Sequence, residues 1–214
     1  ETCAPPAASR YYGLALSSLP AELDPASLKR QAQMLEELGE VLLIQAQYAA
    51  AADTYRKMLK VAEALGEAPC KARAWNGLSW AQDRLGDYSG ALDSAVKAEA
   101  IAREAGARAE LARALFRRGW ALFRMGQAQA VLDIGEQALA LSEELEGRRD
   151  VAFSLKLLGI AHILAGEYGG AKKYQERALR LFEEMGDPWG VANLLNNLGE
   201  NARIQGDYVN AVDI

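Results

Sequence analysis

The chain repeats a pattern of small and aromatic residues every 40 positions. The repeat is clearest at a turn glycine, which recurs without insertions as Gly86, Gly126, Gly166 and Gly206, with Ala46 one period earlier. A second recurring position lies fourteen residues earlier and always holds alanine: Ala32, Ala72, Ala112, Ala152 and Ala192. Such a period is typical of proteins that stack one small structural unit many times.

Each 40-residue unit predicts two helices. The first extends from about the recurring alanine to the turn glycine, because apolar residues such as Leu155 and Leu158 recur there at helical spacing. Glycine then ends it, since glycine accepts the left-handed conformation of a helix C-terminus. The second helix carries Ala171 and Ala178 and ends at Gly186. One pair cannot bury its apolar face alone, so the pattern predicts an all-α fold of stacked helix pairs.

The repeat also predicts the organisation of the chain. Residues 1–31 form an N-terminal segment, with the second helix of a preceding repeat at 10–18 and the start of the next helix at Asp24-Pro25. Repeats are expected at 32–71, 72–111, 112–151 and 152–191, followed by a truncated fifth repeat at 192–214. Neither end carries the polar face of a terminal repeat, so we expect an interior slice of a longer solenoid. The alternative is a short natural array that dimerises through its exposed ends.

Composition argues against several classes of function. The net charge of −5 gives no overall electrostatic footprint for nucleic acid. Cys3 and Cys70 form no CxxC motif, and the lone His162 offers them no nearby metal-ligating partner. We expect no metal, no cofactor and no catalytic residue, with His162 packed against the partner helix of its pair. Cys70, next to Pro69, is expected to be a surface thiol in a connector, and the cysteine content fits a reduced, cytoplasmic setting.

The recurring positions resemble those of the tetratricopeptide repeat. The second unit fills the shared positions with Trp75, Leu78, Ser79, Gly86, Tyr88, Ala91 and Ala98. The fourth unit fills them with Leu155, Leu158, Gly159, Gly166, Tyr168, Ala171 and Ala178. The resemblance covers residues 32–214, although the usual unit has 34 residues. Forty-residue versions are similar to those of large bacterial ATP-binding regulators. The resemblance implies a right-handed α-solenoid, a superhelix of about five antiparallel helix-pair repeats, without enzymatic activity.

The resemblance also implies a binding surface, because the first helix of each pair lines the concave face in this family. The inward positions, which we call the groove positions, are Arg73, Asn76, Trp80, Arg84, Arg113, Phe116, Trp120, Phe123, Arg124, Phe153, Lys156, Asn193 and Asn196. Tryptophan and arginine are enriched at binding hot spots. These residues suit a protein or peptide with an apolar anchor and acidic groups. The alternative is that Trp80, Trp120 and Phe116 pack on one another as core.

Three functions remain open from the sequence. The first is a non-catalytic interaction scaffold, acting as the sensor region of a larger bacterial signalling or transcription-regulating protein, with no direct contact to nucleic acid or membrane. The second is small-molecule sensing at a cluster of Phe116, Trp120, Phe123 and Phe153. The third is homo-oligomerisation through the solenoid ends, with the groove unused.

Overall fold

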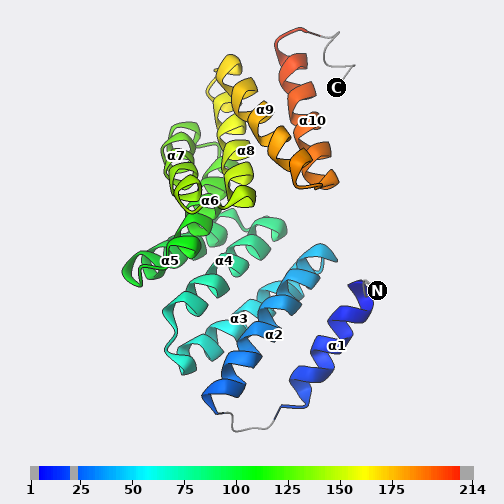
Figure 1. The fold of residues 1–214 in the computed structure, drawn as a ribbon, viewed down its shortest axis with the longest axis vertical. Helices are drawn as coiled ribbons and strands as arrows, with labels where there is room; N and C mark the ends of the chain where they lie inside the picture. Colours follow the sequence, from blue (N-terminus) through cyan, green and yellow to red (C-terminus); the bar gives the residue numbers. More distant parts are fainter. Residues whose placement is uncertain (1–4, 20–23, 208–214) are drawn as a thin grey trace. The chain divides into compact units, whose positions relative to one another are not determined.

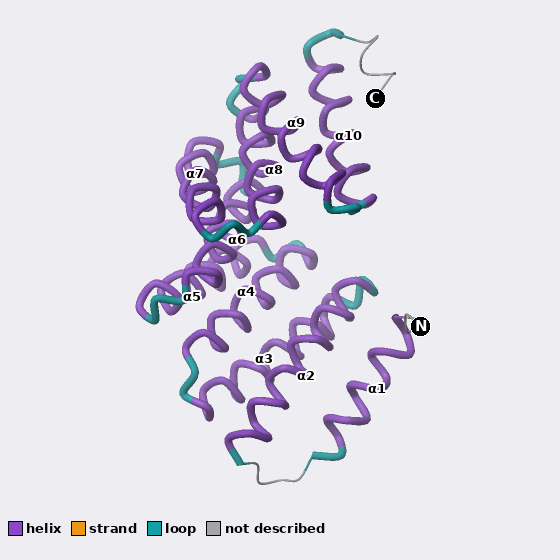
Figure 2. The backbone as a smooth tube through the Cα atoms, in the orientation of Figure 1, coloured by secondary structure: helices purple, strands orange, loops and turns teal. Residues whose placement is uncertain are grey.

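The computed structural model describes residues 5–19 and 24–207, and these residues form ten α-helices without a strand (Figures 1 and 2). The helices are α1 (Pro5–Ser17), α2 (Pro25–Ile44), α3 (Tyr48–Leu65), α4 (Ala68–Leu85), α5 (Tyr88–Glu104), α6 (Arg108–Arg124), α7 (Ala128–Glu144), α8 (Arg148–Leu164), α9 (Tyr168–Glu184) and α10 (Pro188–Ile204). From α3 onwards, equivalent helices begin 40 residues apart, which is the period of the sequence. The second helix expected after Gly206 lies outside the described residues.

Two local signals set the helix boundaries. Gly86 adopts the left-handed conformation at the end of α4, with φ of 83°. At the other end of a helix, the Asp24 carboxylate accepts a hydrogen bond from the Ser27 amide at 2.7 Å, and Pro25 occupies the first turn of α2 as expected. Asp187 caps α10 in the same way, so this helix begins at Pro188, four residues before the recurring alanine.

The chain divides into two compact units, residues 1–117 and 118–214, which we describe separately. In the first unit α1 packs on α2, α2 on α3, α3 on α4 and α4 on α5, and α2 also contacts α4. In the second unit α7 packs on α8, α8 on α9 and α9 on α10, and α8 also contacts α10. Within each unit, first helices of adjacent pairs therefore lie next to each other. The all-α prediction of serially packed helix pairs is confirmed.

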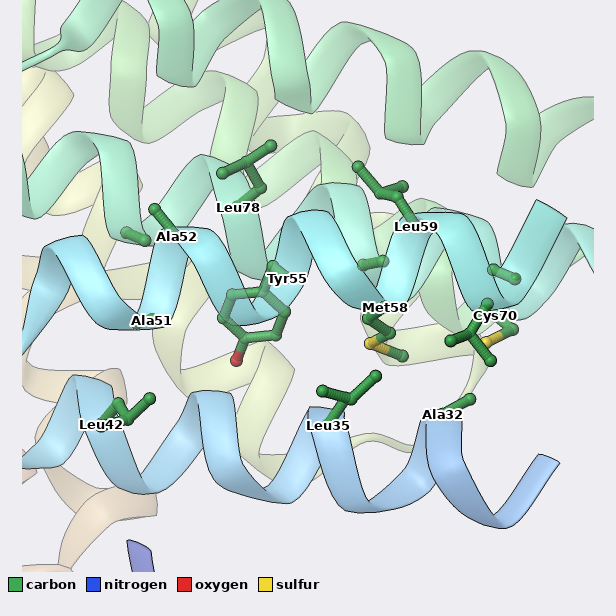
Figure 3. Close-up of a cluster of buried hydrophobic side chains, with 14 of the residues drawn as sticks. Ala32, Leu35, Leu42, Ala51, Ala52, Tyr55, Met58, Leu59, Cys70 and Leu78 are labelled. Atoms are coloured by element: carbon green, nitrogen blue, oxygen red, sulfur yellow. The ribbon is translucent and has the colours of Figure 1, made fainter. Parts of the chain in front are cut away.

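The core of the first unit is built around Tyr55 of α3 (Figure 3). Its ring lies directly against Gly39 and Gly77, and a Cβ atom at Gly77 would stand 2.2 Å from the ring. Cys70 belongs to the same core and is only 1% exposed, so the expectation of a surface thiol is wrong. The reason is that α4 begins at Ala68, which places Cys70 inside the helix, and burial raises the pKa of its thiol.

The core of the second unit contains Leu155, Leu158 and Phe182, all completely buried. Close approach of α8 and α9 depends on Gly159, where a Cβ atom would lie 2.7 Å from Gln175 Cγ and 3.4 Å from the Ala171 carbonyl oxygen. None of the described helices combines the length and the apolar character needed to cross a lipid bilayer.

Candidate functional site

The groove positions fall into two sets, one in each unit. Residues Arg73 to Phe116 belong to α4 and the first part of α6 in the first unit, and residues Trp120 to Asn196 belong to the second. In the first unit Asn76 of α4 hydrogen-bonds the Glu110 carbonyl oxygen of α6, and in the second unit α8 contacts α10.

The first unit holds a charged cluster in which basic and acidic side chains are paired. Arg73 Nε lies 3.1 Å from Glu36 Oε2, and Arg113 lies 3.3 Å from Glu110 Oε1. Glu110 is only 7% exposed, and burial raises the pKa of its carboxyl group. Asn76 is also buried and donates a hydrogen bond to the Glu110 carbonyl oxygen at 3.2 Å. Arg73 and Arg113 thus meet at the Glu110 carboxylate, and Asn76 binds the backbone carbonyl oxygen of the same residue.

Aromatic rings of the first unit are covered by arginine. The Arg117 guanidinium lies 4.2 Å from the centre of the Trp80 ring and 5.4 Å from that of Phe116. Trp80 is half-buried and also packs against the core, so it has a core role as well as a partly accessible face. Arg84 is exposed, lies over the Tyr48 ring at 5.3 Å and donates to the Tyr48 hydroxyl. The sequence missed Arg117 because the inward positions carried over from the family omit it.

The second unit holds an aromatic cage around one lysine. Lys156 of α8 is only 7% exposed, and its Nζ lies 5.4 Å from the Trp120 ring centre and 5.5 Å from that of Trp189. Trp189 lies in the first turn of α10 and is 65% exposed. We call these three residues the Lys156 cage. Sequence reasoning missed Trp189, although a tryptophan directly after a helix-starting Asp-Pro is a visible signal.

Burial has a large effect on this lysine. It lowers the pKa of Lys156 from the usual 10.5 to about 8, and no charged side chain contributes to that shift. Such a change corresponds to roughly 3 kcal/mol against the charged form. Cation–π attraction to the two indoles is worth about 0.5–2 kcal/mol and opposes the loss of hydration without cancelling it. Lys156 forms no ion pair within the described part of the chain.

The remaining aromatic groove positions do not form one cluster. Trp120 and Phe123 contact each other with ring centres 5.3 Å apart. Phe153 instead packs edge-on against the buried Phe182, also at 5.3 Å, and Arg149 lies over its outer side. Phe153 therefore belongs largely to the core of the second unit.

The last three groove positions differ in accessibility. Arg124 and Asn196 are exposed, whereas Asn193 is half-buried.

The contacts of His162 are those of a packed side chain. His162 Nδ1 lies 2.7 Å from Glu167 Oε2, and its ring stacks on Tyr174 of α9, as expected for a side chain that faces its partner helix. The residues that the structure describes contain no group of three or more potential metal ligands from His, Cys, Asp and Glu.

A shallow cavity of ≈ 470 Å³ lies between the end of α7, the start of α8 and α9. It is lined by arginine and glutamate rather than by the groove aromatics.

Known structures share the fold of the chain. BtubC from P. vanneervenii is 21% identical with a TM-score of 0.77, covering 98% of this chain and 85% of BtubC. A Rap protein complexed with competence and sporulation factor is 18% identical with a TM-score of 0.78, covering 92% of this chain and 55% of that protein. A signal transduction ATPase with a tetratricopeptide repeat sensor from Pyrococcus horikoshii is 14% identical with a TM-score of 0.68, covering 92% of this chain and 32% of the ATPase.

No curated protein sequence matches the chain. The family profile of the tetratricopeptide repeat matches it twice, at residues 30–104 and 110–184. Together these matches cover more than half of the sequence, and they agree with the 40-residue spacing of the helices. The chain belongs to the tetratricopeptide repeat family.

Proposed function

We propose that the chain is a non-catalytic scaffold that binds a protein or peptide along its first helices. The observation that carries the proposal is the set of cation–aromatic contacts at first-helix positions, found in both units of a chain with a net charge of −5. Aromatic and arginine side chains in such positions are enriched at binding hot spots. Partly exposed rings beside cations suit a partner with an apolar anchor and nearby acidic groups.

Two of the structural neighbours support a finer version of this proposal. One is a Rap protein bound to competence and sporulation factor, and another is a signalling ATPase with a tetratricopeptide repeat sensor. By analogy, the chain is the interaction or sensor region of a larger bacterial regulatory protein in the cytoplasm. A peptide is favoured over a small inducer because Phe153 packs on Phe182, apart from the Trp120–Phe123 pair, so these rings do not form one local cluster.

The test uses variants that leave the charged cluster and the cores intact. Arg84→Ala and Asn196→Ala each remove one exposed groove side chain, one in each unit. Arg56→Ala on α3 and Lys172→Ala on α9 are matched controls, since both residues are exposed on second helices. A partner captured by the wild-type protein is titrated against all four variants by calorimetry. We expect a five- to tenfold weaker Kd for the two groove variants, about 1 kcal/mol each, and no change for the controls.

Equal affinity for all four variants would show that binding lies elsewhere on the molecule. Light scattering over the same concentration range separates partner binding from self-association, because self-association raises the apparent mass of the protein alone.

A further inference from the structure

The shallow cavity of the second unit lies apart from the groove positions. It measures ≈ 470 Å³, it is bordered by α7, α8 and α9 (Figure 1), and no groove position contributes to its lining. Pockets that hold small molecules in proteins begin at about 300 Å³, so there is room for a small ligand. The lining combines acidic, basic and apolar side chains, which are Glu143, Glu146, Arg148, Val151, Arg177, Arg180, Leu181 and Glu184.

Most of the charged side chains in this lining are already paired with one another. Arg177 Nη2 of α9 lies 2.5 Å from Glu143 Oε1 of α7. Arg148 at the start of α8 pairs with Glu184 at the end of α9. These two pairs hold neighbouring helices together, and a ligand could use them only by breaking them. They therefore form the wall of the cavity rather than its binding groups.

One acidic and one basic side chain of the lining remain available. Among the residues that the structure describes, neither the Glu146 carboxylate nor the Arg180 guanidinium takes part in an ion pair or a hydrogen bond. The apolar part of the same lining consists of Val151, which is buried, and Leu181, which is half-buried. The cavity thus offers a ligand one anionic group, one cationic group and an aliphatic surface.

Both available residues depart from the repeat. The turn between one helix pair and the next holds glycine at positions 66, 106 and 186, but at 146 it holds glutamate with φ of 54°. A side chain in this left-handed conformation costs about 1 kcal/mol, and such strain is found most often at functional sites. Arg180 stands where α5 and α7 have Ala100 and Ala140. The stacking of helix pairs requires neither charge, since the other repeats lack them.

We propose that this cavity binds an aliphatic amino acid as its zwitterion. The Arg180 guanidinium donates two N–H groups to the ligand carboxylate, a geometry that arginine and carboxylate share. The Glu146 carboxylate accepts hydrogen bonds from the ligand ammonium, and the aliphatic side chain of the ligand lies against Val151 and Leu181. A ligand with only one charge would bring it close to a like charge of the lining, so a molecule that carries both is preferred.

The experiment titrates the intact ¹⁵N-labelled protein with leucine, followed by the amide signals in NMR spectra. We expect saturable shifts at the turn between α7 and α8 and in the last turn of α9. Leucinamide lacks the carboxylate and 4-methylpentanoate lacks the ammonium, so each should bind at least about fivefold more weakly at about pH 6.5. The absence of saturable shifts around the cavity, or equal affinity for the three compounds, would overturn the proposal.

Two variants assign the two charges of the ligand to their partners. Arg180→Gln and Glu146→Gln each remove one charge from an exposed side chain and leave both ion pairs of the wall in place, so helicity measured by circular dichroism should be kept. Each should weaken leucine binding at least about fivefold. Arg180→Gln should also bind leucine and leucinamide equally, and Glu146→Gln should bind leucine and 4-methylpentanoate equally. Discrimination that persists in both variants would overturn the proposal.

Matched controls separate this site from general charge effects and from the groove. Glu183→Gln and Lys173→Gln remove one charge each from exposed positions of α9 outside the cavity lining, and they should keep the affinity for leucine. Asn196→Ala, a groove variant, should keep it as well, so that loss of peptide binding and loss of leucine binding are told apart. Equal weakening by the controls and the cavity variants would show that the effect does not come from the cavity.

Discussion

The two units surround basic groove side chains with opposite kinds of neighbour. In the first unit Arg73 reaches Glu36 at 3.1 Å and Glu110 at 3.9 Å, so its charge is compensated by acidic neighbours. In the second unit Lys156 is equally a groove position, but its neighbours are Trp120 and Trp189. A basic residue on a binding face is therefore not always free to pair with an acidic ligand. Whether it is depends on whether the fold already places an acidic side chain beside it.

This difference has consequences for ligand binding. A ligand carboxylate near Arg73 must compete with acidic groups already in place, and breaking such pairs costs free energy. Near Lys156 no such competition exists, because no charged side chain acts on it in the described part of the chain. The burial that lowers the pKa of Lys156 also makes its charged form unfavourable for folding.

The largest expected effect tests whether replacing these two basic residues changes stability in opposite directions. Lys156→Met removes a charge that burial disfavours while keeping the length of the side chain, so we expect stabilisation of about 1–3 kcal/mol at pH 7. Arg73→Met leaves Glu36 and the buried Glu110 with less compensation, so we expect destabilisation of about 1–3 kcal/mol. Urea unfolding at pH 7 measures both. Changes of the same sign in the two variants would remove the contrast between the units.

The pH dependence of stability provides a second test. The pKa of Lys156 is lower in the folded protein than in the unfolded chain, so unfolding takes up a proton between about pH 8 and 10.5. Stability should therefore rise with pH across that window, by about 2 kcal/mol between pH 8 and 10. Lys156→Met should lack this rise. Subtracting the two profiles cancels the other titrating groups, and a difference that does not change with pH would contradict the assignment.

The sequence predicts the repeated elements well, because they depend on local signals. The 40-residue period, the Asp24-Pro25 helix start and the turn at Gly86 all follow from residues within a few positions of the feature they specify. Cys70 was misassigned for a related reason. Pro69 was assigned to a connector, although proline also fits the first turn of a helix, and the start of α4 at Ala68 places Cys70 in the core.

The environment of the groove positions could not be predicted in the same way. Lys156 was predicted as a groove position, but its contact with Trp189 involves a residue of α10 that lies 33 positions away. Phe153 has the same residue type as Phe123 and yet packs on the buried Phe182. Such contacts depend on how adjacent helix pairs pack. A pattern shared by all repeats does not contain this information.

Close helix packing gives a smaller contrast between the units. At Gly77 an added methyl group would meet the buried Tyr55 ring at 2.2 Å. The ring cannot move away easily, because it also lies against Gly39. At Gly119 its closest neighbour would be the Leu157 Cδ2 atom at 2.6 Å, the end of a side chain that can rotate, with Ile134 Cγ2 at 3.5 Å. We expect Gly77→Ala to cost about 1–2 kcal/mol after the gain in helix propensity. Gly119→Ala should be nearly neutral. Thermal unfolding of both variants checks the order, and a larger cost at Gly119 would show that Leu157 is as rigid as the tyrosine ring.

The smallest expected effect concerns a feature that the two units share. Ala46 in the first unit and Glu146 in the second have positive φ values of 56° and 54° at turns where other repeats place glycine. A side chain in this conformation costs about 1 kcal/mol, so Ala46→Gly and Glu146→Gly should each stabilise by about 0.5–1 kcal/mol. Gly86→Ala, with φ of 83°, is the reverse control and should destabilise by a similar amount. Urea midpoints measured on the three variants test this directly. Equal gains at Ala46 and Glu146 would mean that turn strain is the same in both units, which leaves the treatment of buried charge as what distinguishes them.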